Sequence, residues 1–523
     1  MIAQRGRLPS ANGCWTWDPG AASRADNRPA SPPGTWEVAH RRLGKETQRM
    51  TTVPITGTGA EMPPATTAAE RLTARLDRLP MTRSMWIMAL LLTFGGFFDG
   101  YAIGLIGALG PGLFKAKIFT ATTVSFFGMT GFASFIASLF AGLLVAALFV
   151  SYAADHFGRR AIFSFALLWF GIANFMMAIQ TTADGVNIWR FISALGVGLE
   201  LVTVDAYLSE LVPKKNRGQA FGFLQVMGGL SGLVAYFLAW QLIPNAPFGF
   251  DGWRWVAGIG SCAAVVVWWI RLGLPESPRW LAQQGRIEEA ERVMAGIEAR
   301  AEAESGRPLP PPEPPHYQDP RKGSVAEIFG PRYIKRTIML MLFNFFQTVG
   351  FYGFVGWTPT LLIAKGIHVT QSLEYSFVIN ITAVAFPFLI MLFADRIERK
   401  WHVCASCFAI AVFGIAFGFV ITPAALIVLG ACMAMSTSWL SYALHNYQAE
   451  LYPTRIRARG IGFVYSWSRL SGILTPFFIA YFLRDYGVPG VFAFVAACMA
   501  VVIVSVAALG PRTRLQAVEA IAH

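Results

Sequence analysis

The sequence has little charge and lacks the motifs of nucleotide-dependent enzymes. Only 14% of its 523 residues are Asp, Glu, Lys or Arg, while 54% are hydrophobic. This balance excludes an ordinary soluble protein. No P-loop pattern, His-Glu-x-x-His pair or nucleophile elbow occurs, so we expect no enzymatic activity, no metal site and no cofactor. Of the six cysteines, those inside apolar runs are expected to pack as small hydrophobes.

Basic residues outnumber acidic ones and give a net charge of +13. No basic nucleic-acid-binding module accompanies this charge, so nucleic acid is not an expected partner. The Lys and Arg residues instead gather in short loops between apolar runs, as the positive-inside rule describes for membrane proteins. The basic loops are therefore predicted to face the cytoplasm, together with both termini.

Long apolar runs dominate the chain, and each is long enough to span a bilayer as a helix of roughly 20 residues. We predict an all-α membrane protein with twelve transmembrane helices. In the first half they lie near 84–107, 122–149, 161–181, 187–209, 218–242 and 254–273. In the second half they lie near 334–362, 373–394, 401–421, 423–446, 460–483 and 488–509.

The polar segments complete the predicted organisation. Residues 1–80 are expected to be disordered, with Met50 as an alternative start, and the lack of an early apolar run argues against a cleaved signal peptide. Two six-helix bundles, 81–273 and 334–510, flank a cytoplasmic central loop at 274–333. This loop contains a charged helical stretch around Arg286–Ala303 and a proline tract. Residues 511–523 form a cytoplasmic tail.

Two charged motifs occur once in each half at the same offset. Glu210-Leu-x-Pro-x-x-x-Arg217 reappears as Glu450-Leu-x-Pro-x-x-x-Arg457, and the segment that begins at Asp155 reappears from Asp395. A shared offset for two separate motifs indicates an internal duplication. A duplicated helical bundle without an ATP site predicts a secondary transporter with parallel halves.

Several motifs resemble those of the major facilitator superfamily, in particular its sugar-porter-like branch. They are Asp155-x-x-Gly-Arg159-Arg160, Arg190 with Gly196 and Gly198, the Glu210 motif, Gly252-Trp253-Arg254 and Pro275-Glu276-Ser277-Pro278-Arg279. Asp99-Gly100-Tyr101 is similar to the first-helix motif of aromatic-acid and metabolite:proton symporters, although Ala102 stands where those carry a second Asp. The resemblance implies the major facilitator fold, working by alternating access.

The repeated charges are candidates for a cytoplasmic gate. Carboxylate–guanidinium pairs at helix ends would latch the cytoplasmic side when it closes, and breaking them would favour the inward-open state. The alternative is that these charges only set topology. The candidate residues are Asp155, Arg159, Arg160, Glu210, Arg217, Asp395, Arg399, Glu450 and Arg457.

Ionisable residues inside the predicted spans are candidates for proton coupling, because they are costly in a bilayer. A rise of 1.5 Å per residue places Asp99 and Glu200 at similar depths, and Asp205 follows on the same helix. Desolvation favours the neutral form of a carboxyl group, which a reversible proton carrier requires. Alternatively, Arg190 or another cation neutralises one of them in a structural pair.

The second half offers hydrogen-bonding groups and one deep cation. Arg469 lies roughly 15 Å from the predicted cytoplasmic helix end, and its guanidinium suits bidentate capture of a carboxylate. Pairing with an acidic side chain is the alternative. The predicted substrate-binding residues are Arg190, Gln225, Asn344, Gln347, Tyr352, Tyr465 and Arg469.

We therefore predict an integral protein of the bacterial inner membrane that functions as a monomer, with a small-molecule solute and a proton as ligands. The expected activity is proton-coupled symport of an organic anion such as a carboxylate metabolite, driven by the proton gradient. A sugar or polyol porter is the first alternative, followed by drug efflux. A transporter-like receptor that does not transport remains a third class.

Overall fold

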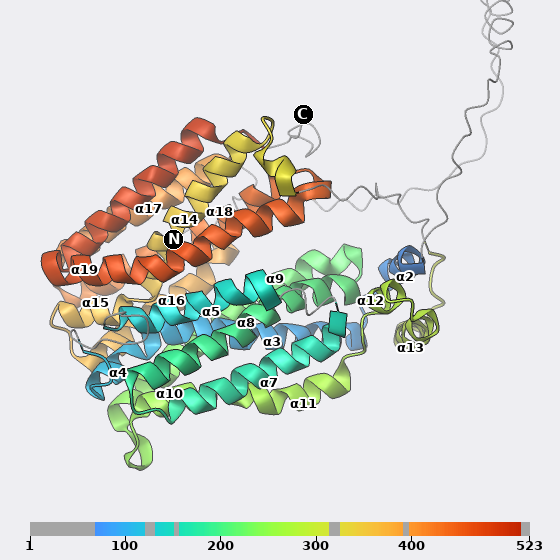
Figure 1. The fold of residues 1–523 in the computed structure, drawn as a ribbon, viewed down its shortest axis with the longest axis horizontal. Helices are drawn as coiled ribbons and strands as arrows, with labels where there is room; N and C mark the ends of the chain where they lie inside the picture. The colour runs from blue at the N-terminus through green and yellow to red at the C-terminus, as the bar shows by residue number, and fades with distance from the viewer. Residues whose placement is uncertain (1–67, 121–130, 151–155, 313–324, 391–396, 514–523) are drawn as a thin grey trace, which may run out of the picture. The chain divides into compact units, whose positions relative to one another are not determined.

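The computed structural model describes residues 68–120, 131–150, 156–312, 325–390 and 397–513. Within these ranges the secondary structure is helical throughout. The helices form two bundles, one from each half of the sequence (Figure 1). This arrangement confirms the predicted fold class.

The N-terminal bundle contains six of the predicted spans. Within it, α3 packs against α9, α7 against α8, and α5 against α8. The bounds are α3 (Arg83–Ala108), α4 (Gly110–Lys115), α5 (Ala133–Val145), η2 (Ala146–Val150), α7 (Arg159–Ala178), α8 (Ala183–Leu211), η3 (Lys214–Asn216), α9 (Arg217–Asn245), η4 (Pro247–Gly249), α10 (Gly252–Ile259) and α11 (Cys262–Gly273).

The C-terminal bundle repeats this packing. Here α14 packs against α19, α17 against α18, and α16 against α18. The bounds are η5 (Val325–Phe329), α14 (Ile334–Val355), α15 (Thr358–Ala364), α16 (Val369–Ile390), α17 (Arg399–Phe419), α18 (Pro423–Glu450) and α19 (Thr454–Leu509).

The observed helices differ from the predicted spans in four places. In the span predicted at 122–149, residues 122–130 lie outside the described residues and the helix begins at Ala133. The span predicted at 254–273 is divided into α10 and α11 at Gly260 and Ser261. The span predicted at 334–362 ends at Val355, and the short helix α15 follows. The last two spans are continuous as α19, bent at Gly487, whose φ of 66° and ψ of −167° lie outside the helical region. A positive φ favours glycine, so this residue makes the bend.

The two halves contact each other through a reciprocal pair of helix contacts. Helix α5 of the first half packs against α19, and α16 of the second half packs against α9. In the duplicated order these are the second helix of each half against the fifth helix of the other. The interface between the halves therefore has the two-fold character that a duplicated chain predicts.

Contacts between the halves are tight at the end that carries α4 and α15. Tyr236 donates a hydrogen bond of 2.7 Å to the Val355 carbonyl, and the rings of Phe132 and Trp357 are 5.7 Å apart. Towards the other end, Gly222 of α9 and Gly462 of α19 have no neighbouring atom within 4 Å of an added Cβ. The halves are therefore in contact at the α4 end. At the opposite end, which we call the α13 end after helix α13 (Ile287–Ser305), these two glycines have free space beside them.

Three helices outside the bundles gather at the α13 end: α2 (Ala68–Asp77), α12 (Pro278–Gln283) and α13 (Ile287–Ser305) (Figure 1). Helix α13 confirms the predicted helical stretch of the central loop. The prediction of disorder is wrong for residues 68–77, because Leu72 and Leu76 are buried where α2 packs against α12 and α13. The rest of the predicted disordered segment up to residue 67 lies outside the described residues.

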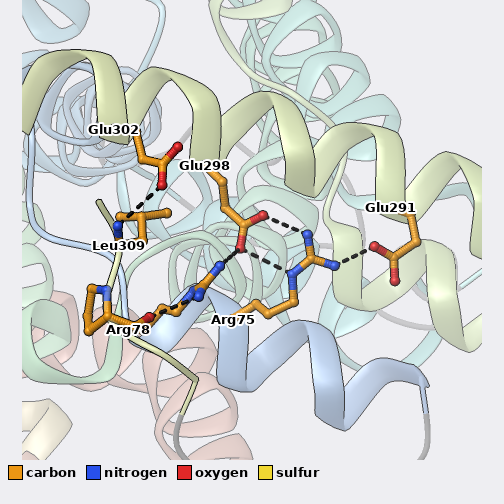
Figure 2. A network of polar contacts seen from close by, with 7 residues as sticks. Arg75, Arg78, Glu291, Glu298, Glu302 and Leu309 are labelled. Atoms are coloured by element: carbon orange, nitrogen blue, oxygen red, sulfur yellow. Dashed lines mark hydrogen bonds and ion pairs between the residues drawn. The ribbon is translucent and has the colours of Figure 1, made fainter. Parts of the chain in front are cut away.

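Ion pairs join α2 to α13, with Glu298 at their centre (Figure 2). Arg75 donates to Glu298 through Nε at 3.1 Å and Nη2 at 2.6 Å, and it also pairs with Glu291. Arg78 donates to Glu298 at 2.7 Å and to the Pro310 carbonyl at 2.9 Å. One carboxylate thus holds two guanidinium groups, one from α2 and one from the residue directly after it.

Replacing Glu298 with Gln should loosen α2. The variant loses charge-assisted hydrogen bonds, and because the group is partly exposed we expect a cost of about 1–2 kcal/mol. Burial raises the pKa of Glu298, but the bonds from Arg75 and Arg78 outweigh it and hold this pKa below its ordinary value. The stabilisation is therefore present at neutral pH and is lost as the pH falls through the folded-state pKa.

Thermal unfolding in detergent and the rate of tryptic cleavage at Arg75 measure this effect. Glu289→Gln is the matched control, since Glu289 pairs with Arg286 of the adjoining loop. Equal unfolding temperatures and equal cleavage rates in both variants would contradict a clamping role for Glu298.

Candidate functional site

Two carboxyl groups face each other between α3 and α8. Asp99 and Glu200 are both buried and act directly on one another. As carboxylates, neither side chain has a hydrogen-bond donor at either oxygen among the described residues. A single proton supplies a donor and removes the repulsion between two buried anions. The two candidates that the helix rise places at similar depths are thus brought together, and the pair suits the binding of one proton.

The close approach of α3 and α8 depends on the small residue Gly95. A Cβ at this position would lie 2.5 Å from Glu200 Oε1 and 2.3 Å from a ring carbon of Phe163. Real Cβ contacts are not so short, so a larger residue would displace the Glu200 carboxyl. Glycine at position 95 thus provides the space for Glu200.

Arg469 of the C-terminal half lies opposite this carboxyl pair. Its guanidinium lies over the Tyr465 ring, with Cζ 5.0 Å from the centroid, and it interacts with the Tyr352 hydroxyl. It is also within electrostatic range of Asp99. Among the described residues, Arg469 forms no ion pair within 4 Å, so its charge remains available to an anion. The predicted group of Tyr352, Tyr465 and Arg469 is brought together.

His445 of α18 belongs to the same group, although the sequence interpretation did not select it. Its ring centroid lies 6.0 Å from that of Tyr465, and it is within electrostatic range of Arg469. A histidine within an apolar run is an ionisable residue in a span, and that signal was present in the sequence. The site therefore includes acidic groups from the first half and basic groups from the second.

Arg190 is buried away from the carboxyl pair. Its Nη2 donates to the Ala102 carbonyl at 2.6 Å, and its Cζ lies 4.9 Å from the Phe135 ring centroid. In the described part of the chain it pairs with no carboxylate, and its Nε and Nη1 have no acceptor. The alternative in which Arg190 neutralises Asp99 or Glu200 is not observed.

The remaining predicted residues differ in their surroundings. Asp205 and Gln225 are exposed, and Asp205 is near enough to act electrostatically on Asp99. Asn344 is buried and donates to the Leu340 carbonyl of its own helix at 2.9 Å, while Gln347 donates to Thr348 at 3.2 Å. None of these three amides has a hydrogen bond to Arg469 among the described residues.

The repeated charged motifs form equivalent ion pairs in the two halves. Arg159 and Glu210 are 3.4 Å apart in the first half, and Arg399 and Glu450 are 3.3 Å apart in the second. Each pair joins two helices of the same bundle. Asp155 and Asp395 lie outside the described residues, so the predicted latch is not tested at these positions.

Glu276 gives the Pro275–Arg279 motif, which follows α11, a structural role. Its Oε1 accepts hydrogen bonds from the backbone N–H groups of Arg159, Arg160 and Ser277 at 3.0, 3.2 and 2.9 Å. Burial raises the pKa of Glu276, although these bonds act in the opposite direction. The carboxylate thus caps the N-terminus of α7 and fixes the position of Arg159 and Arg160 at its start.

The two equivalent arginines Arg217 and Arg457 bond the same backbone position but differ in their side-chain partners. Their Nε atoms donate to the carbonyls of Val212 and Tyr452, each at 3.1 Å. Arg217 also pairs with Asp77 of α2 at 3.2 Å. Among the described residues, Arg457 has no carboxylate partner. The N-terminal copy of the motif is therefore tied to α2.

Comparison with known proteins identifies this arrangement. The model of the family described as sugar (and other) transporter matches residues 88–523. The chain belongs to this transporter family. It is therefore an integral membrane transporter, of a kind found in bacterial inner membranes, and not an enzyme.

Individual relatives agree with the family. The transporter is 27% identical to the niacin transporter NiaP of Acinetobacter baylyi, over 86% of its own length and 99% of the relative. It is also 27% identical to the inner membrane metabolite transport protein YdjE of Escherichia coli, over 87% and 99% of the two chains.

A solved structure shows the same fold. The inward-open conformation of the xylose transporter XylE from E. coli matches with a TM-score of 0.64 and 20% identity, over 84% of this chain and 99% of that one. This likeness supports the major facilitator fold for the transporter.

Proposed function

We propose that the transporter moves a small organic anion together with a proton by alternating access. The observation that carries the proposal is the position of Arg469, which lies opposite the Asp99–Glu200 pair in the other half. A solute carboxylate at Arg469 and a proton on the carboxyl pair would enter the same region between the halves. No cofactor is needed, because the proton gradient supplies the energy.

The steps follow from charge balance. Without a proton, the carboxyl pair carries two negative charges, which face the positive charge of Arg469. One shared proton removes one of these negative charges, and a solute carboxylate then supplies a negative charge at Arg469. Binding of both ligands leaves the net charge of the site unchanged, whereas the solute alone would add an uncompensated charge that opposes closure of the site.

The α13 end is proposed to face the cytoplasm, following the distribution of basic loop residues. The structure would then represent an inward-open state. The repeated ion pairs would brace each bundle as it rocks, and one monomer would contain the complete transport path. The names of the relatives are consistent with an anion, since niacin is a pyridine carboxylic acid.

A sugar or polyol porter is the second candidate, since the family is described as sugar transporters and a xylose transporter shares the fold. Purified protein in liposomes distinguishes the two when a pH gradient is imposed and radiolabelled carboxylates and sugars are supplied. We expect gradient-dependent uptake of a carboxylate. Uptake of sugars alone would refute the anion proposal, and no flux of any solute would favour a receptor.

A further inference from the structure

The hydrogen bond of His445 determines which nitrogen of its ring carries the hydrogen. Nδ1 lies 2.7 Å from the Ser441 carbonyl oxygen. A carbonyl can only accept, so Nδ1 carries a hydrogen and donates it. In the neutral ring, Nε2 then has a lone pair and no hydrogen, and among the described residues it has no hydrogen-bond partner. His445 therefore presents a hydrogen-bond acceptor.

The acceptor lies beside the anion-binding group. Tyr465 lies between the two: its ring is 6.0 Å from the His445 ring, and Arg469 Cζ is 5.0 Å from its centroid. His445 is exposed, while Arg469 and Tyr465 are partly buried. Arg469 and His445 thus both contact the same aromatic ring and lie within electrostatic range of each other, so one small solute can contact both.

The polar groups at this place have different hydrogen-bonding roles. Arg469 has only donors and lies within electrostatic range of the Tyr352 hydroxyl, whereas the His445 Nε2 is an acceptor. A carboxylate matches the donors but gives nothing to the acceptor. The complementary ligand for both is a carboxylate that also carries an O–H or N–H group.

We propose that His445 is a specificity-determining residue that accepts a hydrogen bond from a hydroxyl or N–H group of the transported carboxylate. The proposal rests on the proposed function, in which Arg469 binds the carboxylate. A site built to bond a substrate hydroxyl discriminates against the analogue that lacks it, because the partner group is then left without its hydrogen bond. His445 is exposed, so water competes and the discrimination is moderate.

Matched pairs of ligands test the proposal directly. Affinities are measured by calorimetry on the full-length protein in detergent for benzoate against 4-hydroxybenzoate and for propionate against lactate. A neutral hydrogen bond predicts that the wild-type protein prefers the hydroxylated member of at least one pair by about fivefold.

Two substitutions at position 445 distinguish the role of the hydrogen-bond acceptor from the role of the aromatic ring. His445→Phe keeps an aromatic ring beside Tyr465 but removes the acceptor, so the hydroxylated and the unhydroxylated acid should then bind with equal affinity. His445→Gln restores an acceptor oxygen and should recover part of the preference. The ratio of the two affinities is the readout, since a merely structural role would change both affinities equally.

The possible outcomes are distinct. Equal affinities of the wild-type protein within both pairs, or an unchanged preference in His445→Phe, would overturn the role of His445 and leave the anion proposal intact. If no carboxylate binds while a sugar does, the proposed function is refuted and the role of His445 with it. Loss of both affinities in parallel would show a structural role only.

Discussion

Replacing Glu200 with Gln should abolish accumulation of the solute against its gradient. The variant retains one of the two facing carboxyl groups and loses the shared proton site. One pH unit across the membrane supplies about 1.4 kcal/mol per proton, which is a tenfold accumulation for one proton per solute. We expect this tenfold ratio to fall to about one, while exchange of labelled for unlabelled solute continues.

Proteoliposomes with an internal pH one unit higher measure both activities in the same preparation. Asp99→Asn should give the same result, because either carboxyl group completes the pair. Asp485→Asn is the matched control, since it makes the same chemical change at an exposed position. A Glu200→Gln protein that still accumulates the solute tenfold would show that the pair does not carry the coupled proton.

Replacing Arg469 with Gln should weaken binding of the carboxylate by at least about thirtyfold. Removing one member of a desolvated charge pair costs about 2–5 kcal/mol, and Arg469 is the cation that acts on Asp99. Arg469→Lys keeps the charge but loses the planar fork, so an intermediate loss of about tenfold is expected. Calorimetry with the carboxylate found in the uptake assay gives these affinities.

Arg484→Gln provides the matched control for Arg469. Arg484 also lies over a tyrosine ring, with Cζ 5.8 Å from the Tyr481 centroid, but it is exposed and paired with Asp485. Its removal should leave the affinity unchanged. Equal affinities in Arg469→Gln and the wild-type protein would mean that the solute carboxylate binds elsewhere.

The sequence predicted the helices and their duplication well, because long apolar runs and repeated charges are local patterns. It also placed Asp99 and Glu200 at similar depths, since a fixed rise per residue converts position along a helix into depth. That the two carboxyl groups face each other depends on how α3 packs against α8, which the sequence did not show. The spacing of Tyr465 and Arg469 by four residues places both on one helix face, and the structure confirms their contact.

The features that the sequence did not reveal depend on distant partners. Glu276 caps α7 across more than a hundred residues of chain, and nothing near it in the sequence marks that role. Helix α2 is short and follows a segment rich in Pro and Gly, so its apolar face becomes evident only against α13. Arg190 was assigned to the substrate site by its charge, but its partner is the Ala102 carbonyl, and a backbone group leaves no signal in a sequence.

The contacts of α2 attach the outer helices to the N-terminal bundle, so the motion of this bundle can be measured from them. Asp77 binds both Arg217 and the backbone of Lys214, and α13 packs against α2 and α3. The helices α2, α12 and α13 are therefore attached to the N-terminal bundle and should move with it as a rigid body. A spectroscopic label on the exposed face of α13 would then report the position of that bundle. Its distance to a second label near Gly462 would report directly on opening and closing during the transport cycle.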